Sequence, residues 1–289
     1  MVYGLQIDEM ISTRSNVKVK KRLPATPYLI WMIGFVICPL IAIAISAMTD
    51  KEGNITFENI FAIGDSINGQ ALLFSLAIAV GCTVICILLA YPTALVLRSM
   101  KFRKNGFTLF ILILPMWMNF ILRILAWQMI LSKNGLLNLL LASIGLKPLE
   151  IANTPVALMI GMVYDFLPYM IMPVFNAISD IDEDVIDAAR DLGAGKLNIF
   201  KKIILPLSIP GMLSGIVMVF VPAMTSFVIA DILGGGKVQL IGNIIEQEFM
   251  KSMNWHLGSG LSISLMVMVM LGLAFTMKND HGERDGGLW

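Results

Sequence analysis

Long apolar runs separated by short polar segments make up most of this chain of 289 residues. A transmembrane helix needs about 20 consecutive residues that are mostly apolar, and six runs meet this requirement. The pattern therefore predicts an all-α integral membrane protein with six transmembrane helices. The expected spans cover residues 28–49, 71–97, 107–131, 155–178, 209–233 and 257–277.

The composition agrees with a surface that faces lipid. Hydrophobic residues make up 57% of the chain and charged residues only 14%, whereas a soluble domain carries about a quarter charged residues. The formal net charge of +1 gives no reason to expect nucleic acid as a partner. No small-residue cleavage site follows the first apolar run, which predicts an uncleaved span and not a signal peptide.

Lys and Arg residues are divided unequally between the two sets of loops. Of the 21 residues, fifteen fall on one side of the membrane, five fall on the other side and Arg123 lies within a span. Cytoplasmic loops carry the excess of Lys and Arg, so both termini and the loop at 179–208 are expected in the cytoplasm. The chain is predicted to be one six-helix domain at 28–277, with a cytoplasmic arm at 1–27 and a cytoplasmic tail at 278–289.

Two outer segments contain apolar stretches that are too short to span the membrane. Residues 136–144 predict a short interfacial helix, and residues 240–249 predict a second short helix at or dipping toward the membrane. The first outer loop, at 50–69, is expected to turn at Gly53-Asn54 and at Asn68-Gly69.

The loop at 179–208 is the longest cytoplasmic segment between spans, and it has a helical pattern of its own. Ser179, with Asp182 three residues later, resembles a capping box and predicts a helix start. Gly193 stands where a C-cap glycine is expected. Between them, apolar or small residues recur at helical spacing. These residues are Val185, Ala188, Ala189 and Leu192.

A second short helix is predicted at 196–204, with Leu197, Phe200 and Ile204 on one face. Pro206 is expected to end this helix, and Pro210 is expected to begin the fifth span. Such a loop could rest on lipid headgroups or dock on another protein. The first helix is rich in Asp and Glu, which anionic headgroups repel, so protein docking is favoured.

The motif Asp187-Ala-Ala-x-x-x-Gly193-Ala-x(5)-Phe200-x(2)-Ile203-x-Leu205-Pro206 resembles the EAA loop of permease subunits of binding-protein-dependent ABC importers. Asp187 stands where that family usually has Glu, which keeps the charge and shortens the side chain by one methylene group. Further blocks resemble the polyamine branch of this family, the spermidine/putrescine permeases of the B type. They include Pro115-x-Trp117-x-Asn119, Val163-Tyr164, Leu167-Pro168, Pro222-Ala223-Met224, Asp231-x-Leu233 and Leu240-Ile-Gly-Asn243.

This resemblance implies a permease with the type I ABC importer fold, similar to that of the methionine importer, in the inner (cytoplasmic) membrane. It implies a second permease subunit as heterodimer partner, two ATPase subunits and an extracytoplasmic solute-binding protein. Membrane lipid is expected around this chain. The residues expected to couple to the ATPase are Asp187, Ala188, Ala189, Gly193, Ala194, Phe200, Leu205 and Pro206.

The chain is not expected to hydrolyse ATP itself. Its glycine–lysine run, Gly234-Gly-Gly-Lys237, lacks the spacing of a P-loop and the Ser or Thr that follows the lysine. The resemblance implies that ATP and Mg bind to the partner ATPase. This chain is therefore expected to be a non-catalytic subunit with no cofactor and no metal site of its own.

Charged residues within the spans are costly, so each should be paired or face a wet cavity. Two interpretations of Asp165 stay open. It can line the path of a polyammonium substrate, with Tyr164 and Tyr169 supplying cation–π contacts, or it can pair with Arg123. The other candidates for the substrate path are Trp117 and Asn119.

Three acids near the outer end of the fifth span predict either an acidic vestibule or a contact with the binding protein. They are Asp231, Glu246 and Glu248. Together with Arg123, these residues are the structural or gating candidates.

Three other functions compete with polyamine import. A permease for another small solute, such as thiamine, iron or an oxyanion, shares the same coupling loop. A secondary transporter usually has inverted repeats, which this sequence lacks. An intramembrane enzyme is disfavoured. Asp184-x-x-Asp187-Ala-Ala-Arg190 superficially resembles the aspartate cluster of lipid head-group transferases, but the glycine after the second aspartate is missing. The downstream aspartates that would hold two metals are missing as well.

Overall fold

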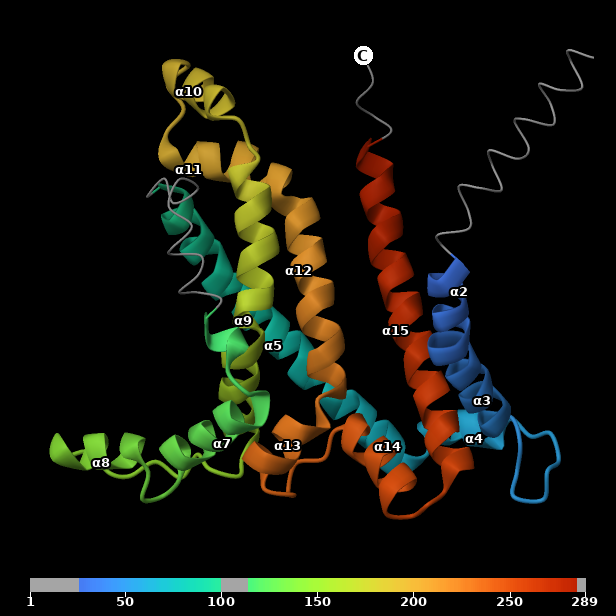
Figure 1. The fold of residues 1–289 in the computed structure, drawn as a ribbon. Helices are drawn as coiled ribbons and strands as arrows, with labels where there is room; N and C mark the ends of the chain where they lie inside the picture. The colour runs from blue at the N-terminus through green and yellow to red at the C-terminus, as the bar shows by residue number, and fades with distance from the viewer. Residues whose placement is uncertain (1–25, 100–113, 285–289) are drawn as a thin grey trace, which may run out of the picture.

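The protein is built from helices, and the long ones run between two opposite ends of the molecule (Figure 1). The computed structural model describes residues 26–99 and 114–284. Within these ranges, six helical stretches are long and apolar enough to cross a membrane, which confirms the expected all-α architecture with six spans. The stretches are Pro27–Ala47, Ser66–Ser99, Phe120–Ser143, Pro155–Ser179, Lys196–Thr225 and Trp255–Ala274.

Short turns of 3₁₀ or π geometry interrupt or join several of the helices. The first half of the chain contains α2 (Thr26–Met32), η2 (Ile33–Ile37), α3 (Cys38–Ala47), α4 (Glu58–Phe61), η3 (Ala62–Gly64), α5 (Ser66–Ser99), η5 (Leu114–Trp117), α7 (Phe120–Leu131) and α8 (Leu136–Ser143). The second half contains α9 (Pro155–Ser179), α10 (Glu183–Asp191), α11 (Lys196–Ile199), η6 (Phe200–Ile204), α12 (Leu205–Thr225), α13 (Phe227–Gly234), α14 (Ile241–Met250) and α15 (Trp255–Arg284).

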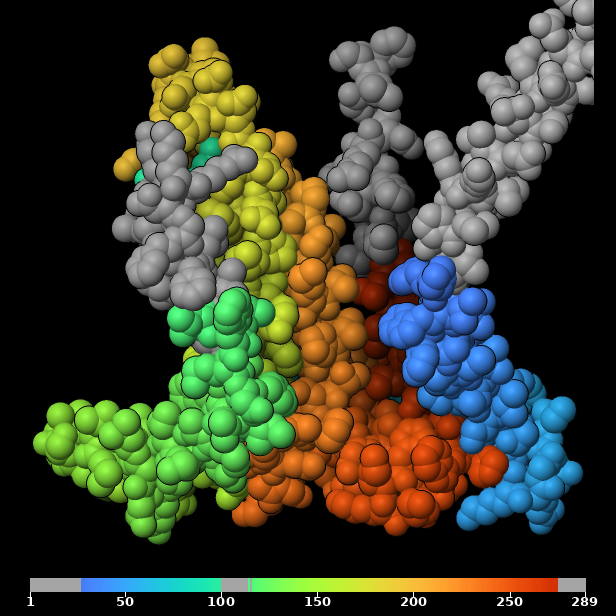
Figure 2. Space-filling model, viewed as in Figure 1, coloured from blue at the N-terminus to red at the C-terminus, as the bar shows by residue number. Residues whose placement is uncertain are grey.

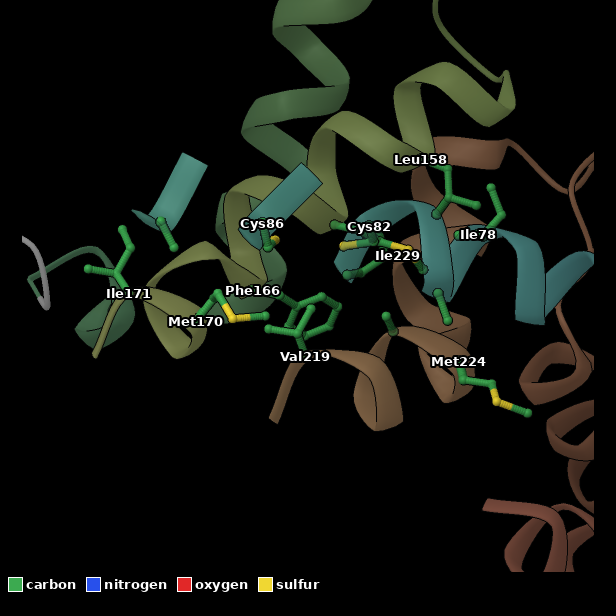
Figure 3. Packing of buried hydrophobic residues seen from close by; sticks show 14 of the residues in the cluster. Ile78, Cys82, Cys86, Leu158, Phe166, Met170, Ile171, Val219, Met224 and Ile229 are labelled. Carbon is green, nitrogen blue, oxygen red and sulfur yellow. The ribbon is translucent and has the colours of Figure 1, made fainter. Parts of the chain in front are cut away.

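Three long helices, α5, α9 and α12, form the main packed core. Figure 3 shows Cys82 and Cys86 of α5 facing Phe166 and Met170 of α9 in this core. Close approach of α12 to α9 depends on two glycines at GxxxG spacing. A β-carbon on Gly215 would lie 2.6 Å from the Met170 sulfur, and one on Gly211 would lie 2.6 Å from the Pro173 carbonyl oxygen.

A second group of helices gathers around α15, beside the core (Figure 1). α15 packs against α3, α4 and α14, whereas its contact with α12 is slight. The first span is mostly exposed, with Phe35 at 73% of its full accessibility. Apolar surface of this kind is stable only against lipid or another protein.

The third and fifth expected spans are broken. Asn119 lies between η5 and α7, where its side-chain oxygen accepts hydrogen bonds from the N–H groups of Ile121 and Leu122. Residues 107–113 of the third span lie outside the described residues. The fifth span, expected at 209–233, is divided at Ser226 into α12 and α13.

The outer loops differ from expectation in one respect and agree in another. Asn68 and Gly69 belong to the first turn of α5, so the turn expected there was wrong; the Asn68 side chain instead donates to the Ala62 carbonyl. The two short outer helices are confirmed as α8 and α14. The third apolar stretch, Phe120–Ser143, therefore joins α7 to an outer helix and extends beyond the span expected at 107–131. Figure 1 places α4, α8, α13 and α14 at one end of the molecule and α10 and α11 at the other.

Candidate functional site

The polar segment between α9 and α12 has an N-cap at a different position from the one predicted. Ser179 is the last residue of α9, so the capping box expected there was wrong. Asp182 is the N-cap of α10, and its carboxylate accepts a hydrogen bond of 3.2 Å from the Asp184 N–H. Glu183 and Asp184 then lie in the first turn, where negative charge is favourable to the helix dipole.

The expected C-cap at Gly193 is confirmed. Gly193 has φ +79°, its N–H donates to the Arg190 carbonyl, and the Ala194 N–H donates to the Ala189 carbonyl. This pair of hydrogen bonds is the Schellman motif, which needs a left-handed residue at this position. The bend between α10 and α11 is therefore fixed by the backbone and by a residue without a β-carbon.

The buried face of α10 lies outside the stripe of apolar and small residues predicted from the spacing. Ile186 is the buried residue, and it packs with Ile181 and Ile199 in a small cluster of its own. Leu192 is 89% exposed and Val185 is 46% exposed. The hairpin of α10 on α11 thus presents Val185, Ala188 and Leu192 outward, at the end of the molecule.

Pro206 does not end the second helix and Pro210 does not begin the fifth span, contrary to both expectations, because Pro210 lies inside α12. α11, η6 and α12 follow one another without a break from Lys196 to Thr225. The Leu205 N–H donates to the Phe200 carbonyl, one residue further back than in an α-helix. This wider π turn comes directly before Pro206 and reduces the conflict between the proline ring and the preceding turn.

Three residues that the sequence analysis did not select tie this segment to the core. The Tyr91 and Ser208 hydroxyls form a hydrogen bond, and the Tyr91 ring meets the Phe200 ring edge-on at 5.9 Å. The Arg98 guanidinium, at the end of α5, donates to the carbonyls of Ile178 and Ile181. The hint available in the sequence was the presence of two polar residues, Tyr91 and Arg98, in the largely apolar helix α5.

A cavity of about 620 Å³ lies between α10, α11 and the end of α5. Asp187 lines this cavity and pairs with Arg190 at 2.6 Å, with both side chains more than 60% exposed. Ala188, Gly193 and Pro206 are exposed, whereas Ala189, Ala194, Phe200 and Leu205 are half-buried. The first group is accessible to another protein, and the second group holds the segment together.

Within the membrane region, Arg123 of α7 and Asp165 of α9 form a salt bridge of 2.6 Å. Their side chains are 8% and 5% exposed. Of the two interpretations left open by the sequence, the structure contains the ion pair. Tyr164 meets the Trp127 ring at 5.2 Å. Tyr164, Tyr169 and Trp117 are all exposed, unlike the carboxylate of Asp165.

The three outer acids have different surroundings. Asp231 of α13 accepts a hydrogen bond of 2.6 Å from the side chain of Asn243, which also donates to the Phe227 carbonyl. Asn243 is only 1% exposed, and its oxygen accepts from the Leu240 N–H. Glu246 lines a cavity, and Glu248 is half-buried elsewhere on α14.

We expect Asn243→Ala to destabilise the outer end by about 2 kcal/mol, because the buried Leu240 N–H loses its acceptor and the contacts of Asn243 with Asp231 and the Phe227 carbonyl are lost. The thermal unfolding temperature of the detergent-solubilised protein is the measurement. Asn134→Ala, at an exposed outer asparagine, is the matched control and should leave it unchanged. Equal unfolding temperatures for the two variants would contradict the bridging role of Asn243.

Comparison with known proteins identifies a family and several relatives. The family model described as "Binding-protein-dependent transport system inner membrane component" matches residues 86–278. The chain is 39% identical to the spermidine/putrescine transport system permease protein PotB of Haemophilus influenzae, over 83% of this chain and 87% of that protein. It is 38% identical to PotB of Escherichia coli K12, over 84% of this chain and 91% of that protein.

Solved structures resemble the fold. A chain of a bacterial alginate ABC transporter, in complex with an alginate pentasaccharide-bound periplasmic protein, aligns with a TM-score of 0.76. The alignment covers 90% of this chain and 94% of that chain at 17% sequence identity. A second alginate importer structure aligns with a TM-score of 0.71.

Proposed function

This chain belongs to the family of binding-protein-dependent transport system inner membrane components, and from this premise we propose that it imports polyamines such as spermidine and putrescine. It is the permease subunit of an ABC importer, and a partner subunit hydrolyses ATP. The similarity to the PotB relatives along more than four fifths of the chain carries the choice of substrate.

The cytoplasmic segment at 179–208 is the proposed link to the ATPase. Its outward residues Val185, Ala188 and Leu192 offer a small apolar surface, and Asp187 adds a negative charge beside it. An apolar patch with a charged rim is typical of a protein-docking surface. An ATPase subunit with a matching cleft and a basic residue is the partner that this surface fits.

Several contacts allow the segment to move as one body. Ile186 and Ile199 hold α10 on α11, and the Gly193 cap fixes the bend between them. Arg98 and Tyr91 connect the segment to α5. A displacement at α10 is therefore transmitted to packed helices instead of being lost in a flexible loop, as in other rigid-body switches.

The outer end is where this displacement would act on the pathway. α12 continues from η6 to Thr225, next to the break at Ser226. The proposed importer also contains a second permease subunit, two ATPase subunits and an extracytoplasmic binding protein. Each permease subunit supplies one coupling segment. Asp165, Tyr164, Tyr169, Trp117 and Asn119 stay candidates for the substrate path.

ATP hydrolysis by the reconstituted importer provides the test of the substrate. The complex with the partner permease and the ATPase is placed in lipid nanodiscs, and the binding protein is added with each candidate solute. We expect spermidine or putrescine to stimulate hydrolysis several-fold and to be taken up by proteoliposomes. Stimulation by thiamine, iron or an oxyanion, with no response to polyamines, would replace the polyamine proposal by another solute of the same importer class.

A further inference from the structure

A cavity of about 730 Å³ lies between α12, α14 and α15 near the outer end of the molecule. Figure 2 shows the hollow between α12 and the group around α15 from the side. The volume falls within the range of about 300–1,000 Å³ that is usual for small-molecule sites. Apart from one acid and two hydroxyl-bearing residues, its lining is apolar or aromatic.

Glu246 is the charged residue that lines this cavity among the described residues. It is half-buried on α14, and no hydrogen bond or ion pair to another described residue satisfies its carboxylate. Lys, Arg and His are absent from the described lining. A carboxylate held against apolar surface without a partner favours a cation as its ligand.

Aromatic rings belong to the lining of the same cavity. Phe227, Phe249 and Trp255 line the cavity, and the rings of Phe249 and Trp255 meet at 5.5 Å with an interplanar angle of 70°. Aromatic faces attract ammonium groups, and the remaining aliphatic side chains suit methylene groups. The wall thus combines the three features that an aliphatic polyammonium ion needs: one negative charge, aromatic faces and apolar surface.

The structure assigns to this cavity the role of a binding station for one ammonium group and the adjoining methylene chain of the transported solute. Glu246 is the charge partner, and Phe227, Phe249 and Trp255 form the wall. This inference rests on the proposed function, because an oxyanion importer would gain nothing from a carboxylate at this place. The inference gives Glu246 and Asp231 different roles, because the Asp231 carboxylate already accepts a hydrogen bond from Asn243.

The test uses the complete importer in proteoliposomes with Glu246→Gln, Glu246→Asp and the matched control Glu150→Gln. Glu150 is an exposed outer acid. Loss of a charge-assisted contact predicts that Glu246→Gln lowers the amount of spermidine imported per ATP hydrolysed by about tenfold. Glu246→Asp should recover much of this ratio, and Glu150→Gln should match the wild type.

The outcomes distinguish the two proposals. If the wild type imports polyamines and Glu246→Gln matches Glu150→Gln, the ammonium site is refuted and the proposed function stands. If the wild type imports no polyamine, both fall together. A Glu246→Gln complex that loses the partner permease during purification, and is equally poor with Glu246→Asp, would instead show that the cavity is filled by the partner subunit, which also overturns the inference.

Discussion

Asp187→Lys is expected to lower solute uptake by at least about tenfold and to reduce the amount of ATPase that co-purifies, while the protein still inserts into the membrane. The reason is the position of Asp187 on the exposed side of α10. Its ion pair with Arg190 is largely exposed, and such pairs contribute only about 0–1 kcal/mol to stability. Reversing the charge at a docking surface costs several kcal/mol when it meets a like charge.

Asp187→Glu is the matched variant, because it keeps the charge and restores the residue that the family usually has. We expect its uptake to equal or exceed that of the wild type. The thermal unfolding temperature should be the same for all three proteins. Normal uptake and a normal yield of co-purified ATPase with Asp187→Lys would contradict the role of α10 as the coupling element.

Breaking the Arg123–Asp165 pair on one side is expected to cost about 3–5 kcal/mol of stability, because it leaves a buried charge without its partner. Asp165→Asn and Arg123→Leu should therefore both lower the unfolding temperature and the uptake. Arg123→Leu combined with Asp165→Leu should recover most of both quantities, since replacing a whole buried pair by apolar residues is often neutral.

The double variant also decides between the two roles of Asp165. Recovered uptake would mean that Asp165 acts through Arg123, by holding α7 on α9. Recovered stability without recovered uptake would place Asp165 on the substrate path. Unchanged stability and uptake in both single variants would contradict either role.

The number and class of the helices could be predicted because the bilayer imposes them. Six runs had the required length, and the described residues contain six such stretches. The helix ends at Ser226 and Asn119 could not be predicted, because both lie inside apolar runs. At these two positions the capping side chain and the neighbouring helices decide where a helix ends, and the spacing of apolar residues does not predict it.

The coupling segment was predictable as a helix, a glycine bend and a second helix, since Gly193 and the residue spacing carry local information. Its buried face was not predictable. Helical spacing is compatible with either of two faces, one that carries Val185, Ala188, Ala189 and Leu192 and one that carries Ile186. Which face is buried depends on the contact with Ile199 across the bend. Tyr91 and Arg98 were missed for the same reason, because their partners lie far away in the chain.

The unbroken helix from Lys196 to Thr225 sets an angular relation between the cytoplasmic surface and the outer half of the fifth span. Each residue of a helix adds about 100° of rotation and about 1.5 Å of length. Deleting one residue between Pro206 and Thr225 would turn α10 by more than a quarter of a circle relative to α13, whereas the turn at 235–240 is outside this constraint. Insertions and deletions in this stretch are therefore expected to be harmful because they rotate α10 relative to α13. This holds even at positions where the side chain itself could be replaced.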